Sequence, residues 1–347
     1  MKYILFFSLI ITIYAIGYYC PTPSFTLIPS SNYGTLKKMI ILTRHGDREN
    51  IVRSLNESIC YDENNNRKQC ELSQLTEKGK QRLNQFGKDI RDYLIKNDIS
   101  IETMKYTIES TNKERTIQSA QSFIQGVFQR NVSMNEIHIE KEKYETNLYI
   151  EDEYLNLSKE DYEEMIHTIP SIVYNSVKRL EHLLEEKQKE LSILMKISYL
   201  YDYLAVKECL NTLEDQYKQD FTILHEYLIF RWNRYYQQES SKRETQQLRK
   251  QLKEYLIDSL KCENEKCSFE SDFNFHFISG HDITLYFFLR SLGLNDVSFA
   301  PYGSSVIIEV IEKEKQLYCR LSFNSKVIRL CNEEKLCVFN EFISYFD

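Results

Sequence analysis

Two predicted strands in the first third of the chain are each followed by a segment with helical periodicity, and this alternation constrains the fold more than any other feature. Residues 37–43 (KKMIILT) predict a buried strand, and residues 75–94 predict a helix with Thr76 as its N-cap. A second strand is expected at residues 105–111 and a second helix at residues 116–128. The order strand, helix, strand, helix favours a parallel sheet with helices on its faces.

Between residues 141 and 265 the sequence becomes rich in leucine, lysine and glutamate. The stretches 171–197 and 245–260 each carry an apolar stripe at helical spacing and a charged opposite face, which predicts amphipathic helices. We therefore expect residues 141–265 to form a helical insertion.

Sheet character returns in the last quarter of the chain. Residues 272–285 contain a third predicted strand, and residues 304–312 and 316–331 predict an antiparallel pair. The expected fold class is α/β, with a mixed, mainly parallel central sheet flanked by helices and an inserted smaller α-helical domain. Residues 34–140 and 266–347 are expected to form the α/β core.

The amino-terminal residues 1–17 are expected to form a secretory signal peptide, with Lys2 as its positive end and an apolar segment over residues 3–16. The alternative is an uncleaved anchor helix, because the apolar stretch approaches the length that spans a bilayer. The Pro-Thr-Pro at residues 21–23 favours cleavage, and no other segment of the sequence could span a membrane. We expect a secreted, lysosomal or otherwise lumenal product. Three glycosylation sequons fit this route: Asn56, Asn131 and Asn156.

The cysteine count agrees with an oxidising compartment. Nine cysteines are present, and Cys20 lies at the edge of the signal, which leaves eight and suggests four disulfides. Short separations suggest three pairs, Cys60–Cys70, Cys262–Cys267 and Cys331–Cys337. These three would leave Cys209 to pair with Cys319. The spacing does not match a zinc site, because no C-x-x-C occurs and no histidine pair accompanies the cysteines.

Each of the three predicted strands is followed by residues that suit an anion. The first strand is followed by Arg44, His45 and Arg48, the second by Arg115, and the third by His281 and Asp282. In open α/β sheets, ligands bind beyond the carboxyl ends of the strands. If the three strands are neighbours, these six side chains meet in one crevice.

Such a crevice suits a phosphoryl group. The forked donors of arginine match phosphate oxygens, and Arg44, Arg48 and Arg115 would neutralise their charge. A neutral imidazole at His45 can attack phosphorus to form a phosphohistidine, which water then hydrolyses. Asp282 is suited to protonating the leaving alkoxide. Because a carboxylic acid donates only while it is protonated, we expect an acid pH optimum.

Simpler interpretations stay open for some of these residues. Arg115 could form an exposed salt bridge instead, since Lys113 and Arg130 also lie near the second helix. Asp282 could serve only as a cap for the segment that follows it. His276 alternates with two phenylalanines on the third strand, so a structural role is expected for it.

The segments around the candidate residues resemble the histidine acid phosphatases, in the branch of the histidine phosphatase superfamily with acid phosphatases and phytases. ILTRHGDRE (41–49) is similar to the opening signature Arg-His-Gly-x-Arg-x-Pro, and LTEKGKQRLNQFG (75–87) resembles the landmark Leu-Thr-x-x-Gly. STNKERTIQSA (110–120) resembles the Arg-Thr-x-x-Ser-Ala segment, and SGHDITL (279–285) resembles the Gly-His-Asp segment. The resemblance spans residues 39–343 and is weakest in the helical insertion.

The resemblance implies a role for each candidate residue: His45 is the nucleophile, Asp282 is the proton donor, and Arg44, Arg48, Arg115 and His281 bind the phosphate. It also implies a mixed-sheet α/β core, a helical second domain, and chemistry without a metal or organic cofactor. One departure is visible, since Asn50 stands where the family usually has proline. This affects the rigidity of the loop more than contact with phosphate.

We expect an acid phosphatase that hydrolyses phosphate monoesters. Two alternatives stay open: a narrower phosphatase, such as a phytase or phosphosugar phosphatase, and a secreted glycoprotein that binds phosphate without turnover. Phytate would favour basic residues around the pocket rim, and the net charge of −7 gives no hint of them. The expected partner is a small phosphate monoester or a phosphorylated protein or sugar, and not a nucleic acid. A homodimer is left open.

Overall fold

The computed structural model divides the chain into two compact units. Unit 1 contains Met1–Pro21, Asp47–Gln74 and Asn147–Gln237, and unit 2 contains Thr22–Gly46, Leu75–Thr146 and Gln238–Asp347. The residues that the structure describes are 20, 25–50, 59–61, 67–69, 72–131, 133–140, 159–235, 238–263, 266–269, 273–295, 300–331 and 335–347.

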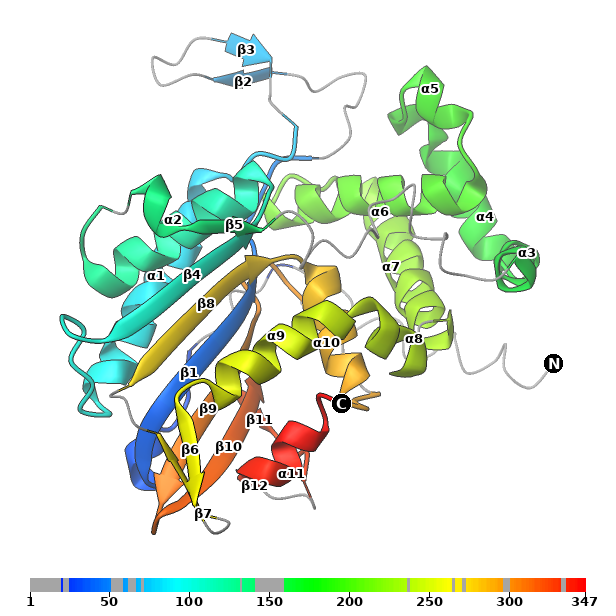
Figure 1. Ribbon diagram of the computed structural model, residues 1–347. Coiled ribbons are helices and arrows are strands. Elements are labelled where there is room, and N and C mark those ends of the chain that lie inside the picture. Colours follow the sequence, from blue (N-terminus) through cyan, green and yellow to red (C-terminus); the bar gives the residue numbers. More distant parts are fainter. Residues whose placement is uncertain are drawn as a thin grey trace. The chain divides into compact units, whose positions relative to one another are not determined.

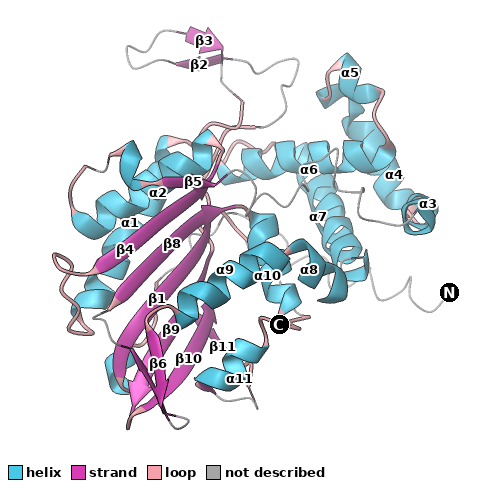
Figure 2. Ribbon diagram, viewed as in Figure 1, coloured by secondary structure: helices cyan, strands magenta, loops and turns pink. Residues whose placement is uncertain are grey.

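Unit 2 is built on a large mixed sheet (Figures 1 and 2). Its strands lie in the order β11, β10, β9, β1, β8, β4, β5, with β12 paired to β10. Strands β1, β8, β4 and β5 are parallel, and the others pair antiparallel. The bounds are β1 (Thr35–Arg44), β4 (Lys105–Thr111), β5 (His138–Glu140), β8 (Asn274–Gly280), β9 (Ser305–Lys313), β10 (Gln316–Phe323), β11 (Lys326–Ile328) and β12 (Cys337–Val338). The α/β fold class with a mixed sheet is confirmed, and so is the predicted antiparallel pair, which is β9 with β10.

Residues 39–42 of strand β1 form an unbroken apolar run because both faces of the sheet are covered. Met39 and Ile41 lie in the core cluster beside α1 and α2, whereas Ile40 and Leu42 lie in the cluster beside α9 and α10. A strand buried on both faces must be apolar at successive positions rather than at alternate ones. Figure 1 shows these two helical layers on the sheet. The helices are α1 (Glu77–Ile95), α2 (Glu114–Phe128), α9 (Gln246–Ile257) and α10 (Asp282–Ser291).

Helices α1 and α2 pack so closely that their contact requires glycine. A Cβ built on Gly87 would lie 2.0 Å from the carbonyl oxygen of Phe123, and one on Gly126 would lie 2.1 Å from that of Asn84. At the start of α1, the side chain of Thr76 accepts a hydrogen bond from the backbone of Gly79, as expected of its N-cap. This packing holds α2 against the sheet, and the first turn of α2 comes shortly after the end of β4.

The remaining part of unit 2 includes residues that the sequence assigned to the helical insertion. Leu248, Leu252 and Leu256 of α9 lie in the core cluster with the sheet. Leu260, expected at the end of this helix, instead begins strand β6 (Leu260–Glu263), because the helix ends at Ile257. The other elements are η1 (Ser30–Asn32), η2 (Met134–Glu136), β7 (Lys266–Phe269), α8 (Gln238–Glu244) and α11 (Phe339–Ser344).

The described residues of unit 1 form helices and one two-stranded sheet. Its elements are β2 (Ile59–Tyr61), β3 (Arg67–Gln69), α3 (Lys159–His167), α4 (Ser171–Leu180), η3 (Glu181–Leu183), α5 (Glu186–Lys189), α6 (Ile193–Cys209) and α7 (Asp215–Tyr235). The single helix expected over residues 171–197 is wrong. Leu184 is extended, Glu185 begins α5 with a capping box, and the Ser192 side chain caps α6. These caps start new helices where the apolar stripe alone predicted continuity.

The cysteine pairing differs in part from the expectation. Cys331 is bonded to Cys337 as expected, but Cys209 is bonded to Cys20 rather than to Cys319. Cys319 is a buried free thiol. The register of β6 and β7 places Cys262 opposite Cys267, whose side chains lie outside the described part. The Cys60–Cys70 pairing also lies outside the described residues.

The predicted signal peptide and the sequons at Asn56 and Asn156 fall outside the described residues, whereas Asn131 is exposed. Among the helices of the described part of the chain, none combines the length and the apolar character needed to cross a membrane.

Candidate active site

The three polar segments found in the sequence follow three adjacent parallel strands. Arg44 at the end of β1 pairs with Gly280 at the end of β8. Ser110, near the end of β4, pairs with Ser279 of β8. Because parallel strands end at the same edge of a sheet, the segments that follow β1, β8 and β4 leave the sheet side by side.

His45 is buried and its ring is held in one tautomer. Its Nδ1 lies 2.8 Å from the carbonyl oxygen of Gly46, and its backbone N donates to Gly280 O at 2.9 Å. A carbonyl oxygen only accepts, so in the neutral ring the proton sits on Nδ1. The lone pair of the imidazole is therefore on Nε2.

Gly46 closes the turn after the histidine. Its backbone N donates to Ser119 Oγ at 3.0 Å, and a Cβ there would lie 2.5 Å from the carbonyl oxygen of Gly79. Ser119 Oγ in turn donates to the carbonyl of Arg115 at 2.7 Å. This chain of contacts links the turn after His45 to the first turn of α2, where Arg115 is 4% exposed.

Arg44 is held on several sides and is 1% exposed. Its Nη1 donates to the carbonyl of Ala300 at 2.7 Å, and its Nη2 lies 3.0 Å from Oδ2 of Asp282. The ring of Tyr302 lies under the guanidinium, 4.1 Å from its central carbon. The orientation of Arg44 is thus fixed by a carbonyl, a carboxylate and an aromatic ring.

His281 and Asp282 occupy the start of α10. His281 Nε2 lies 3.0 Å from Oγ1 of Thr111, the last residue of β4, and its ring is 5.5 Å from that of His45, edge to face. Oδ1 of Asp282 accepts from the backbone N of Ile283 at 2.9 Å. The Asp282 side chain is 18% exposed, so it is partly accessible to solvent.

Arg48 belongs to unit 1, where it forms an ion pair with Asp202 of α6. Nη2 lies 2.5 Å from Oδ1 and Nη1 lies 3.2 Å from Oδ2, so the contact is bidentate. Both side chains are largely buried. The sequence reasoning did not find Asp202. The signal that could have found it is a single aspartate inside the apolar stretch YLYDYLAV of this helix.

The structure also shows the contacts of the residues for which a simpler role was considered. Arg130 forms an ion pair with Glu136 at 2.6 Å at the surface. The Asp282 side chain contacts the backbone of α10, and it also pairs with Arg44. His276 is buried, and its ring stacks on Tyr255 with centroids 4.3 Å apart. Burial, followed by the positive charge of Lys38, lowers the pKa of His276 to about 4.

One group of potential metal ligands occurs among the described residues. Ligand atoms of Cys331, Cys337 and Glu341 lie within 4.8 Å of one another. The two cysteines form a disulfide with each other, so neither offers the thiolate that a metal needs.

Both the sequence and the fold of this chain are similar to those of known proteins. The family model described as Histidine phosphatase superfamily (branch 2) matches residues 35–324. The phytase from Citrobacter braakii has a TM-score of 0.61 at 14% identity, and covers 90% of this chain and 97% of that chain. The phytase from D. castellii has a TM-score of 0.60 at 14% identity, with 92% and 80% covered. The Bifidobacterium longum multiple inositol polyphosphate phosphatase, solved with inositol hexasulfate, has a TM-score of 0.62 at 12% identity, with 95% and 96% covered. No curated protein matches the chain.

Proposed function

We propose that this chain, which belongs to branch 2 of the histidine phosphatase superfamily, is an acid phosphatase that hydrolyses phosphate monoesters through a phosphohistidine on His45. The observation that carries the proposal is the contact of His45 Nδ1 with the carbonyl oxygen of Gly46. In the neutral ring this contact leaves the lone pair on Nε2, which is the atom and the form that a nucleophilic histidine requires.

The first step forms a bond between His45 Nε2 and phosphorus and breaks the bond from phosphorus to the ester oxygen. The leaving alkoxide takes a proton from the carboxyl of Asp282, which must therefore enter the reaction protonated. In the second step, water attacks the phosphohistidine, and inorganic phosphate leaves as Nε2 regains its lone pair. Asp282 then accepts the proton from that water and is ready for the next cycle.

The charge on the phosphoryl oxygens needs fixed donors. Arg44 is held by Ala300 and Asp282, so its guanidinium is oriented before substrate arrives. We assign Arg115, Arg48 and His281 to the same task from the sequence motifs. The ion pair with Asp202 supports a fixed guanidinium at Arg48 too.

A second candidate function is the hydrolysis of inositol polyphosphates. It is favoured by the similarity to phytases and to an inositol polyphosphate phosphatase, although at 12–14% identity this similarity carries only the fold. The net charge of −7 disfavours a substrate that carries many phosphates. We therefore place a broad monoesterase first and a phytase-like enzyme second.

We also propose an oxidising compartment, either secreted or lysosomal. The predicted signal peptide and the disulfides Cys20–Cys209 and Cys331–Cys337 support this assignment.

The test is hydrolysis of p-nitrophenyl phosphate by the wild-type protein and by His45→Ala, from pH ~3 to ~8. We expect a maximum in the acid range and a loss of about a thousandfold or more in His45→Ala. Unchanged activity in His45→Ala, or no turnover by the wild type, would overturn the proposal. A kcat/KM for phytate well above that for simple alkyl phosphates would select the second candidate.

A further inference from the structure

We infer that the loop Ala300–Ser304 orients the nucleophile His45 and the side chain of Arg44. Within this loop, Tyr302 is the residue that positions both side chains. This inference rests on the proposed function, because it concerns the geometry of the same site. It rests on the contacts of the loop and not on a sequence motif.

The backbone of the loop is tied to the two residues that it supports. The backbone N of Arg44 donates to Ser304 O at 2.9 Å, and the backbone N of Gly303 donates to His45 O at 3.1 Å. Beyond these contacts, the antiparallel pairing of β1 and β9 begins with Thr43 opposite Ser305. The loop therefore extends the sheet contact past the end of β1 and holds the backbone on which both side chains are mounted.

Two further contacts act on the side chains. Ala300 O accepts from Arg44 Nη1 at 2.7 Å. The Tyr302 ring lies 4.1 Å from the central guanidinium carbon of Arg44, and its centroid is 5.7 Å from that of the His45 ring. Tyr302 is 0% exposed, so a single buried ring contacts both the nucleophile and a phosphate-binding arginine. A guanidinium over a desolvated tyrosine ring is stabilised by a cation–π interaction.

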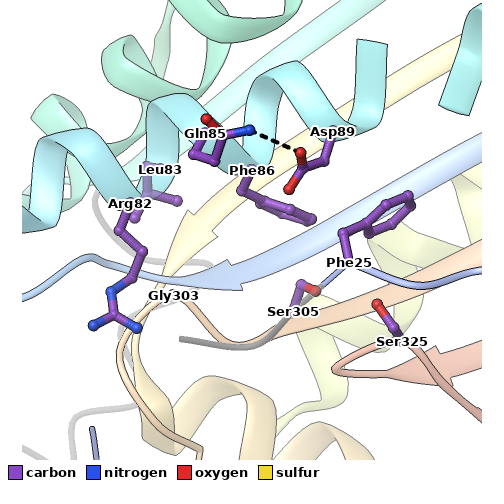
Figure 3. Close-up of a pocket in the computed structure, with 9 residues that line it drawn as sticks. All are labelled: Phe25, Arg82, Leu83, Gln85, Phe86, Asp89, Gly303, Ser305 and Ser325. Atoms are coloured by element: carbon purple, nitrogen blue, oxygen red, sulfur yellow. Dashed lines mark hydrogen bonds between the residues drawn. The ribbon is translucent and has the colours of Figure 1, made fainter. Parts of the chain in front are cut away.

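Arg82 of α1 holds the loop from behind. Its Nη1 lies 3.4 Å from Tyr302 O, and its side chain is 8% exposed. Gly303 has a φ of +72°, and a Cβ there would lie 2.7 Å from Cδ of Arg82. Figure 3 shows the Arg82 side chain running alongside the chain at Gly303. Glycine at this position permits both the left-handed backbone and the close approach of Arg82.

The ring has a consequence for catalysis because in-line attack depends on alignment. Without the ring, the guanidinium of Arg44 and the imidazole of His45 would each gain freedom to tilt. A displacement of about 1 Å at a reacting group costs about a hundredfold in rate. A purely structural tyrosine would instead change the amount of folded protein and leave the remaining active sites unaltered.

The experiment compares Tyr302→Phe with Tyr302→Leu. Phenylalanine keeps the ring, so we expect kcat/KM within about threefold of the wild type. Leucine removes the ring, and we expect kcat/KM to fall by about a hundredfold, with the affinity for inorganic phosphate about tenfold weaker by calorimetry. Equal losses in the two variants would overturn the inference. So would a fall in kcat for leucine with KM and phosphate affinity unchanged, because that reports only fewer folded molecules.

A second pair of variants covers the case in which Tyr302→Leu does not fold. We expect Arg82→Met to raise the dissociation constant for inorganic phosphate about threefold, whereas Gln81→Ala, at the neighbouring exposed position of α1, should not change it. Equal phosphate affinity in these two variants would count against the inference. Calorimetry measures phosphate binding and does not need turnover. A wild-type protein that binds phosphate but is inactive would contradict the proposed function, and the two variants would still test the inference. A wild type that does not bind phosphate defeats both.

Discussion

The carboxyl of Asp282 has two tasks that oppose each other. One is to pair with the buried Arg44, whose Nη2 lies 3.0 Å from its Oδ2. Proton donation to a leaving group requires the neutral acid.

The role of Asp282 predicts a dependence on the leaving group. We expect Asp282→Asn to lower kcat about a thousandfold for an alkyl phosphate and about tenfold for p-nitrophenyl phosphate, whose phenolate needs little protonation. The measurement is kcat for both substrates in both proteins. Equal losses on the two substrates would contradict proton donation by Asp282.

The ion pair between Arg48 and Asp202 predicts an effect on stability. Asp202→Asn removes the charge that faces a guanidinium whose side chain is only 7% exposed. Breaking a buried pair on one side typically costs about 3–5 kcal/mol, and we expect the free energy of unfolding to fall by about 2–4 kcal/mol in urea.

The matched control for Asp202→Asn is Asp215→Asn. Asp215 pairs with Lys218 at the surface, where its side chain is 93% exposed. An ion pair between fully exposed side chains contributes little to stability, so this variant should unfold like the wild type. Similar losses in both variants would indicate that the Arg48–Asp202 pair is no more important than a surface pair.

At the scale of elements, the contact between α1 and α2 determines where Arg115 and Ser119 lie. We expect Gly87→Ala to destabilise the protein by about 2 kcal/mol or more in urea unfolding, although alanine favours helices by about 1 kcal/mol over glycine. The reason is steric, since the new Cβ would meet the carbonyl of Phe123. The exposed neighbour Lys88→Ala should change stability by less than about 0.5 kcal/mol. A Gly87→Ala variant as stable as the wild type would show that the helices can separate without cost.

Local sequence patterns predicted several elements closely. Strand β4 has the bounds expected for it, Lys105–Thr111, and Thr76 caps α1. The helix expected over residues 171–197 was wrong because its stripe of apolar residues continues across the capping residues Glu185 and Ser192. Periodicity reports which face is buried, whereas caps decide where the backbone turns.

At the scale of the whole molecule, each unit contains a buried histidine that remains neutral in mild acid. Burial lowers the pKa of His225 in α7 to about 4, and burial together with Lys38 lowers that of His276 to about 4. An unfolded histidine titrates near pH ~6.5. As pH falls from about 6.5 to about 4, the unfolded chain takes up protons that the folded chain does not, so stability decreases by up to about 3 kcal/mol per histidine.

The lowered pKa values of these two histidines predict that the folded protein becomes less stable within the acid pH range where activity is expected. We expect the free energy of unfolding to fall between pH ~7 and ~4.5, and His276→Phe to reduce that fall by about 2 kcal/mol. Phenylalanine can retain the stacking on Tyr255. The exposed variant His138→Gln is the matched control. If the free energy of unfolding falls equally with pH in both variants, His276 does not cause the loss of stability.

The parts of the site that the sequence did not predict are contacts between residues far apart in the chain. The motifs predicted His45, because a histidine between two arginines is informative on its own, and Asp282, because it follows the third predicted strand. Nothing near Tyr302 in the sequence indicates that its ring meets Arg44 and His45. The pairing of Cys20 with Cys209 was missed because Cys20 was set aside with the signal peptide. Spacing along a chain does not determine distances across a fold.

The most direct measurement concerns the covalent intermediate. The protein is mixed with p-nitrophenyl phosphate at acid pH, quenched rapidly into base to preserve phosphohistidine, digested, and analysed by mass spectrometry. We expect a phosphoryl group on His45 in the wild-type protein, a larger amount of it in Asp282→Asn with an activated substrate, and none in His45→Ala. A phosphoryl group on another residue, or full turnover by His45→Ala, would contradict the account.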